Sequence, residues 1–463
     1  MSAHPYMPNS TPELRQPFLD HVGIDDVEEL FAQIPPHHRL KGELALPPAM
    51  ASEAVLRRHL VELLAANDTC ERNLSFLGGG IWQHHVPAVV DEIVRRSEFL
   101  TPVWGTPSSD HGRNQAWFEF ASQLGELVGM EFVGLPVYSW GCAEGNAIRM
   151  AARITGRDHV LVPRAISPER LAVIRTYCGS PALDGSIEVE LLDYDPETGG
   201  LDLDDLRAKL SPRTAAILFE NPGFLGTIEV NAAEIAATAR EAGAETIVGV
   251  DPISLGVLAP PGAYGADIVV GSVQPLGVHM SAGGGAGGFI ATRDEPSYAH
   301  QYPTLNLSIA ETTVGEYGFS MTLFHQTSYG SREEGNDWTG NSVYLHAVAN
   351  AAYMAMMGPE GFAELGRLVI GRSHYAARRL AAIEGVSVRA QAGFFKEFVV
   401  GFDGTGRTVT EVNRQLRAHG IFGGIDLSTS FPELGQSALY CVTEMHEQAD
   451  LDLLAATVEE VIA

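Results

Sequence analysis

The sequence predicts an α/β fold in which a large, mostly parallel sheet is followed by a smaller C-terminal α/β unit. Between about residues 117 and 292, helical segments alternate with short apolar runs that are rich in β-branched residues and bounded by Gly and Pro. A second, shorter series of helices and strands follows residue 342. Because 463 residues exceed what one hydrophobic core usually supports, we expect an N-terminal arm over 1–70, a large domain over 71–335 and a small domain over 336–463.

The individual elements follow from the spacing of apolar residues and from the residues that interrupt it. In the arm we expect a helix near 24–33 and another over 51–67, where Leu56, Leu60 and Leu63 recur at helical spacing. A Gly-rich loop then precedes a helix over 87–96. For the large domain we expect helices over 117–128, 145–155, 168–178 and 232–242, and strands over 135–138, 160–163, 188–192, 215–220, 246–250 and 267–271. For the small domain we expect helices over 342–357, 362–383, 409–419 and 448–462, and strands over 386–389, 398–402 and 438–442.

The composition excludes several classes of function. A formal net charge of −28 argues against binding to nucleic acids or anionic membranes, which require a basic face. The four cysteines are scattered without zinc spacing, so we expect no metal site and a cytoplasmic protein with reduced thiols. The N-terminus lacks the charged and apolar regions of a signal peptide, and no apolar run is long enough to span a membrane.

The positions of the lysines carry the main functional signal. The chain has only three, Lys41, Lys209 and Lys396, beside 27 arginines. In enzymes built around pyridoxal phosphate (PLP), an Asp after a buried strand pairs with the pyridinium nitrogen, and a later Lys forms the Schiff base. Here Asp251 follows the strand, but Gln274 and Pro275 stand where the Lys is expected. Neither side chain can form an imine, and Arg cannot substitute because its guanidinium is never deprotonated. We therefore expect the scaffold of a cofactor enzyme that is silent by itself.

Motifs along nearly the whole chain resemble one family, the first (alpha) subunit of the glycine decarboxylase of the glycine cleavage system. The matching stretches are HRLK (38–41), LPPA (46–49), SFLGGG (75–80), VPAV (86–89), DPISLG (251–256), PPG (260–262), GADIVVG (265–271), GPEG (358–361), FFKEF (394–398) and VTE (442–444). The resemblance implies the fold of the PLP-dependent transferases of fold-type I, which is aspartate aminotransferase-like. It also implies an α2β2 heterotetramer in which a homologous beta subunit carries the lysine and holds PLP covalently. The complex would decarboxylate glycine, or a related amino acid, and pass the aminomethyl group to a lipoyl carrier protein.

Three loops depart from the family pattern, and each contains a Trp. They are residues 100–112, 138–142 and 332–338. Trp104, Tyr138 and Trp140 are therefore candidates for a substrate pocket, although buried aromatic residues more often belong to the core. These departures leave open a specialised paralogue that acts on a different amino acid. A non-catalytic partner that stabilises or regulates a PLP enzyme, and a self-sufficient enzyme that anchors PLP through Lys396, also remain as alternatives.

Each remaining candidate residue has a functional and a structural interpretation. Asp251 is either a vestigial pyridinium partner or a cap at a strand end, and Gln274 is expected to fill the emptied site by hydrogen bonding. His84 and His85 are candidates for acid/base chemistry in a shared active site, or for packing at a helix start. Asn341 and Ser342 either contact the phosphate of the partner's PLP or cap a helix. The backbone N–H groups of the loop 77–80 are candidates for a phosphate contact or a tight turn.

Overall fold

The computed structural model describes residues 6, 11–42, 44–99, 107–179, 185–281, 286–323, 326–336, 343–389 and 393–463. By its internal contacts the chain forms two units, Met1–Asp68 and Thr69–Ala463. Trp104, Asn341 and Ser342 lie outside the described residues. None of the helices in the described ranges is long and apolar enough to cross a membrane.

The N-terminal unit consists of two helices and a short helical turn. Helix α1 covers Pro12–Val22, a region for which the sequence pattern predicts no helix. The helix predicted near 24–33 is a 3-10 turn over Val27–Phe31, which Asp26 begins with a capping box. Helix α2 (Glu53–Leu64) lies inside the predicted range, and none of its residues is buried.

A seven-stranded sheet forms the centre of the second unit, in the order β2-β8-β7-β6-β5-β3-β4. The strands are β2 (Phe132–Val133), β3 (His159–Pro163), β4 (Glu188–Leu192), β5 (Thr214–Glu220), β6 (Glu245–Val250), β7 (Ile268–Ser272) and β8 (Gly288–Thr292). Only β8 runs against the others, because it is antiparallel to both of its neighbours while the remaining pairs are parallel. The prediction of a large, mostly parallel sheet is therefore confirmed. The strand predicted over 135–138 is reduced to a single bridge between Val137 and Gly288.

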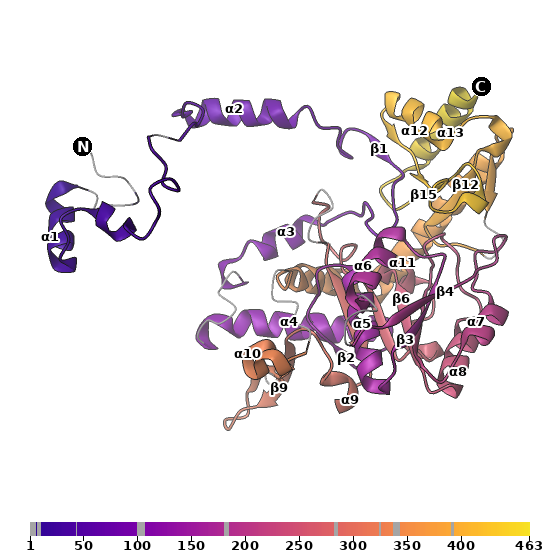
Figure 1. Ribbon diagram of the computed structural model, residues 1–463. Coiled ribbons are helices and arrows are strands. Elements are labelled where there is room, and N and C mark those ends of the chain that lie inside the picture. The colour runs from indigo at the N-terminus through magenta and orange to yellow at the C-terminus, as the bar shows by residue number, and fades with distance from the viewer. Residues whose placement is uncertain are drawn as a thin grey trace. The chain divides into compact units, whose positions relative to one another are not determined.

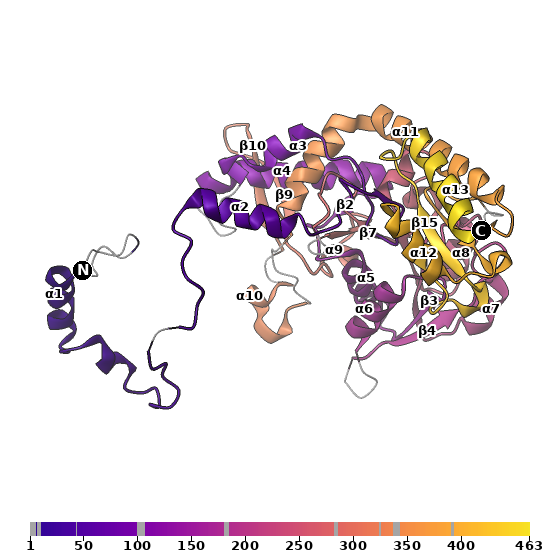
Figure 2. The ribbon, with the colours of Figure 1, turned by 90° about the horizontal axis from the view of Figure 1, so that it is seen from above.

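Helices cover both faces of this sheet, since alternate residues of each strand face opposite sides. Ile217 and Val248 pack in one core with α4 (Pro107–Val128) and α11 (His346–Ala381). Leu218 and Ile247, their neighbours along the strands, pack in a second core with α5 (Trp140–Thr155) and α6 (Pro168–Cys178). Figures 1 and 2 show α5 and α6 side by side against the sheet. The other α-helices in the described part of this region are α3 (Ala88–Val94), α7 (Leu203–Lys209), α8 (Ala232–Glu241), α9 (Pro296–Ala299) and α10 (Ser328–Ser331).

Two elements beside the large sheet differ from the sequence expectation. Strands β9 (Asn306–Glu311) and β10 (Tyr317–Thr322) form an antiparallel hairpin that the apolar pattern does not predict, because all but one of its residues are half-buried or exposed. The two helices predicted over 342–357 and 362–383 form one element, α11, which is kinked at Gly358. Gly358 has a φ of 57° and precedes Pro359, so the helix cannot pass straight through this point.

The C-terminal region is built on an antiparallel sheet in the order β11-β12-β15-β14. Its strands are β11 (Ser387–Arg389), β12 (Glu397–Gly401), β14 (Ile425–Asp426) and β15 (Ser437–Cys441). Helices α12 (Val409–Ala418) and α13 (Gln448–Ile462) share a core with β12 and β15, and Figure 2 shows them beside β15. A short parallel pair, β1 (Leu74–Ser75) with β13 (Ile421–Phe422), ties the start of the second unit to this sheet.

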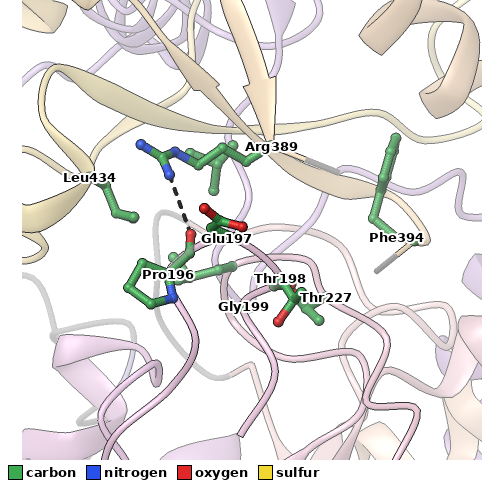
Figure 3. A pocket seen from close by; sticks show the side chains of 11 residues that line it. Pro196, Glu197, Thr198, Gly199, Thr227, Arg389, Phe394 and Leu434 are labelled. Atoms are coloured by element: carbon green, nitrogen blue, oxygen red, sulfur yellow. Dashed lines mark hydrogen bonds between the residues drawn. The ribbon is translucent and has the colours of Figure 1, made fainter. Parts of the chain in front are cut away.

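The C-terminal sheet also contacts the loop that follows β4. The Arg389 guanidinium donates a hydrogen bond to the Pro196 carbonyl (3.3 Å), as Figure 3 shows. Thr227 pairs with Phe394 through an isolated bridge nearby. The pocket drawn in Figure 3 lies between these segments and is lined mainly by small and apolar residues. Because Arg389 is used to hold a backbone carbonyl, we assign this pocket a structural role.

Candidate functional site

The candidate site lies where the central parallel strands end. Glu220 is the last residue of β5, Asp251 directly follows β6, and Gln274 lies two residues after β7. In open α/β sheets, ligands bind outside the carboxyl ends of the strands. The sheet therefore brings the predicted residues Asp251 and Gln274 to the place where a cofactor is expected.

Asp251 has two partners. Its Oδ1 accepts a hydrogen bond from the Ile253 N–H (3.1 Å) and so begins the 3-10 turn Pro252–Gly256. Its Oδ2 lies 2.8 Å from Nζ of Lys396, which stands directly before β12. The side chains of Asp251 and Lys396 are only 5% and 2% exposed, so this is a buried ion pair. Asp251 is thus both a cap and the counter-ion of a lysine that lies far away in the sequence.

Lys396 connects Asp251 to a second pair of residues. Its Nζ lies 3.0 Å from Nε2 of His84, and Nδ1 of His84 lies 2.7 Å from Oε2 of Glu444. An ammonium group can only donate hydrogen bonds, so Nε2 of His84 must accept and Nδ1 must carry the proton that Glu444 receives. His84 therefore bridges Lys396 and Glu444, and its side chain is buried.

Glu444 ends this chain of contacts. Its Oε1 accepts a hydrogen bond from the backbone N–H of His85 (2.7 Å). Burial by itself would raise the pKa of Glu444, but the His84 ring and the His85 N–H outweigh burial and lower the pKa to about 2. The residue His85 is exposed, so of the two predicted histidines only His85 has a side chain open to an outside group.

Gln274 is fully engaged with the backbone. Its Oε1 accepts from the Trp82 N–H (3.1 Å), and its Nε2 donates to the carbonyls of Trp82 (3.0 Å) and Val278 (3.2 Å). These bonds hold Trp82 so that its indole lies over Lys396, with Nζ 3.4 Å from the ring centroid. Pro275, at the position expected for the Schiff-base lysine, is buried beside it.

Trp140 and Tyr138, both predicted for a substrate pocket, lie in different surroundings. Trp140 begins α5 and is buried, with its ring 5.9 Å from that of Trp82 and 4.2 Å from the Arg170 guanidinium. Tyr138 is 41% exposed. A cleft of ≈ 210 Å³ opens beside Tyr138, Ser139 and the start of α5. Trp140 belongs to the core, and it lines the cleft together with Tyr138.

A second buried ionic group underlies Trp140. Arg170 makes two hydrogen bonds to Glu220 (2.7 and 2.9 Å), and its Nε lies 3.8 Å from Glu144. Burial and the neighbouring Glu220 raise the pKa of Glu144 well above its usual range, although Arg170 acts against that rise. Arg170 also donates to the Gly79 carbonyl (3.0 Å).

The Gly-rich loop is occupied by side chains of the protein itself. The Gly79 N–H donates to Oε1 of Glu397 (2.6 Å), and the Gly79 carbonyl accepts from Arg170. Burial raises the pKa of Glu397, although the Gly79 N–H and Lys396 act against that rise. The N–H that was a candidate for a phosphate contact is therefore used within the fold.

Comparisons with known proteins agree with this architecture. The family model described as glycine cleavage system P-protein matches residues 4–457. The chain belongs to this family. It is 36% identical over 470 aligned positions to the probable glycine dehydrogenase (decarboxylating) subunit 1 of Staphylothermus marinus, covering all of this chain and 99% of the relative. It is 35% identical over 465 positions to the protein of the same name from Saccharolobus islandicus, with the same coverage.

Two solved structures have a fold similar to that of this chain. A crystal structure of glycine decarboxylase (P-protein) of the glycine cleavage system, in inhibitor-bound form, superposes with a TM-score of 0.88 at 32% identity, and covers all of both chains. A sphingosine-1-phosphate lyase from Burkholderia pseudomallei shares the fold, with a TM-score of 0.62 at 14% identity over 93% of this chain. The predicted fold-type I of PLP-dependent transferases is confirmed.

The family depends on PLP, but the residues of this chain do not fit the cofactor. No amine stands at position 275, and Asp251 is already paired with Lys396. The cavity among Trp82, Trp140, Asp251 and Lys396 has a volume of ≈ 10 Å³, no more than a single water molecule needs. A pyridine ring therefore has no room in it.

Sequence reasoning locates Asp251 and Gln274, but it considers Lys396 only as an alternative anchor for PLP and misses its pairing with Asp251. The available signal is a charged residue inside the apolar run from Phe394 to Val400, in a chain with only three lysines. A lysine that is retained directly before a buried strand needs a buried counter-charge.

Proposed function

We propose that this chain is the non-lysine, alpha-type subunit of a two-chain glycine decarboxylase, and that a homologous beta subunit supplies the lysine and holds PLP covalently. The observation that carries the proposal is the pairing of Asp251 with Lys396. It leaves this chain without a place for PLP, in a family whose relatives are named glycine dehydrogenase (decarboxylating) subunit 1.

Glycine is the proposed substrate because the relatives are named glycine dehydrogenase (decarboxylating) subunit 1. The case for another substrate rests on three loops that gained a Trp. Of these, Trp140 is buried between Trp82 and Arg170, and it also lines the cleft beside Tyr138. The other two, Trp104 and Trp338, lie outside the described residues.

The proposed complex is an α2β2 heterotetramer in the cytoplasm that passes the aminomethyl group to a lipoyl carrier protein. The N-terminal unit supports the need for a partner chain, because α2 exposes Val55, Leu56, Leu60, Val61 and Leu64. Contiguous exposed apolar residues typically mark a protein-binding surface. The four cysteines are all free, as in a reducing compartment.

One observation favours a second candidate, a partner that only stabilises the lysine-bearing chain. Asp251, His84, Glu444 and Lys396 are engaged with one another rather than aimed at an outside group. Under this alternative the chain would shape the complex without contributing to chemistry.

Reconstitution with the lysine-bearing homologue tests the proposal. Release of CO₂ from carboxyl-labelled glycine, with a lipoyl acceptor present, is expected from the pair and absent from this chain alone. The homologue alone is the control, and turnover equal to that of the pair would contradict the proposal. The variants His85→Ala and Asn341→Ala separate the two candidates. A contributing subunit loses turnover with the complex intact, whereas for a stabilising partner turnover follows complex formation only.

A further inference from the structure

We propose that Lys396 takes the place of the cofactor's cation: its ammonium is the permanent counter-ion of Asp251 and closes the cofactor cleft of this chain. This inference concerns the chain by itself and goes beyond its proposed role in a two-chain enzyme.

The contact between Lys396 and Asp251 is incompatible with PLP between them. In PLP the ring nitrogen and the aldehyde-bearing carbon lie on opposite sides of the ring. A carboxylate that pairs with the nitrogen is thus separated by the whole ring from an amine bonded to the aldehyde carbon. Nζ of Lys396 lies 2.8 Å from Oδ2 of Asp251, in direct contact. Lys396 is therefore the replacement for the pyridinium, and not a displaced Schiff-base lysine.

Three side chains together fill the space of a ring. The amide of Gln274 binds both the N–H and the carbonyl of Trp82 and fixes that residue. The indole of Trp82 lies 3.4 Å from Nζ of Lys396 and 5.9 Å, between ring centroids, from Trp140. The protein itself thus places an aromatic ring, that of Trp82, and a cation, that of Lys396, beside the Asp251 carboxylate.

Electrostatics requires a cation at this point. Asp251, Glu397 and Glu444 are all withdrawn from solvent around Lys396 and His84. A carboxylate buried without a partner is strongly destabilising. Lys396 neutralises Asp251 and, through His84, orients Glu444 toward the His85 N–H. The cleft is thereby stable without a cofactor.

Chemical rescue tests the role of the ammonium. Lys396→Ala in the full-length chain is expected to lower Tm by about 5 °C, because it leaves Asp251 unpaired. Millimolar propylammonium, which reproduces the end of the lost side chain, should restore part of that loss. Tetramethylammonium, which cannot donate a hydrogen bond, should not. Lys209→Ala is the matched control, because Lys209 pairs with Asp205 at a more exposed site, and its Tm should not respond to propylammonium.

A double-mutant cycle keeps the test decisive if Lys396→Ala does not fold. Lys396→Met removes the charge with little change in bulk, and Asp251→Asn removes its partner. The double variant is expected to lose less Tm than the sum of the two single losses, and to fold even where the single lysine variant does not. A loss of Tm in the double variant that equals the sum of the two single losses would overturn the proposal.

Borohydride reduction in the presence of PLP gives a third readout. Mass spectrometry of the wild-type chain is expected to find no pyridoxyl group on the peptide that contains Lys396. A stoichiometric adduct at Lys396 would overturn the proposal. All three tests use this chain alone, so their failure would be distinct from a failure of the two-chain reconstitution.

Discussion

The side chain of Gln274 binds the backbone of Trp82 at both of its polar groups, accepting from the N–H at 3.1 Å and donating to the carbonyl at 3.0 Å. A side-chain amide that pairs with a backbone in this way imitates a strand contact between residues 192 positions apart. The residue that stands in place of a catalytic lysine has thus become part of the scaffold.

Gln274→Ala is expected to lower the free energy of unfolding by about 2–3 kcal/mol. The change leaves the N–H and carbonyl of Trp82 buried without their partner, and each unsatisfied group costs about 1–3 kcal/mol. Urea denaturation followed by Trp fluorescence measures the effect. Gln115→Ala is the control, since Gln115 makes only an exposed contact with Glu119, and its effect should stay below about 0.5 kcal/mol. Equal effects at the two positions would contradict the role assigned to Gln274.

Acid should destabilise the wild-type chain more than a Glu444→Gln variant. The pKa of Glu444 is lowered to about 2 from 4.5. A carboxyl group with a lowered pKa in the folded state contributes stability above its unfolded pKa, and this stability is lost as the pH falls through the folded pKa. The loss between about pH 5 and pH 2 amounts to about 3 kcal/mol.

Glu144 and Glu397 act in the opposite direction, because their pKa values are raised in the fold. Their contribution is common to both proteins, so the difference between wild type and Glu444→Gln isolates Glu444. Unfolding curves in urea at several pH values give this difference. Parallel pH profiles for the two proteins would refute the low pKa of Glu444.

The buried cluster of Arg170, Glu144 and Glu220 should tolerate the change Glu144→Gln but not the loss of the Arg170 cation. Burial raises the pKa of Glu144 and so favours its neutral form, which glutamine resembles; Glu144→Gln should therefore change the free energy of unfolding by less than about 1 kcal/mol. Arg170→Met leaves Glu220 buried and unpaired, and should cost about 3–5 kcal/mol. Denaturant unfolding at pH 7 compares the two variants. A larger loss for Glu144→Gln would show that Glu144 is ionised.

Two glycines of α11 should respond oppositely to the same substitution. Gly358 has a φ of 57° and a ψ of 178°, which side chains other than that of glycine rarely allow, and open space where the Cβ of an alanine would stand, so Gly358→Ala should cost about 1–3 kcal/mol through backbone strain alone. Gly371, further along the same helix, also has open space but no such φ, and Gly371→Ala should gain about 0.5–1 kcal/mol. Thermal unfolding measures both signs. A gain at Gly358 would mean that the kink is not required.

The sequence was sufficient for the parts of the structure that depend on local pattern. The buried strands β5 to β7 are apolar runs bounded by turn residues, and their carboxyl ends carry Asp251 and Gln274 as expected. The position of Lys396 could not be derived in this way, because its pairing with Asp251 joins segments that are distant in the chain and leaves no periodic trace. The hairpin β9–β10 was missed for a different reason: its two strands pair with each other, and only one of their residues is buried.

The ion pair of Lys396 with Asp251 also constrains how such a chain can change over evolution. A lysine introduced at position 275 would find the carboxylate already neutralised and the ring space filled by Trp82, so that single step would bring no reactivity. Loss of Lys396 first would leave the buried Asp251 carboxylate without a counter-ion. Either single substitution therefore gives a chain that is inactive or less stable. The Lys396 amine thus favours the continued division of the enzyme between two polypeptides.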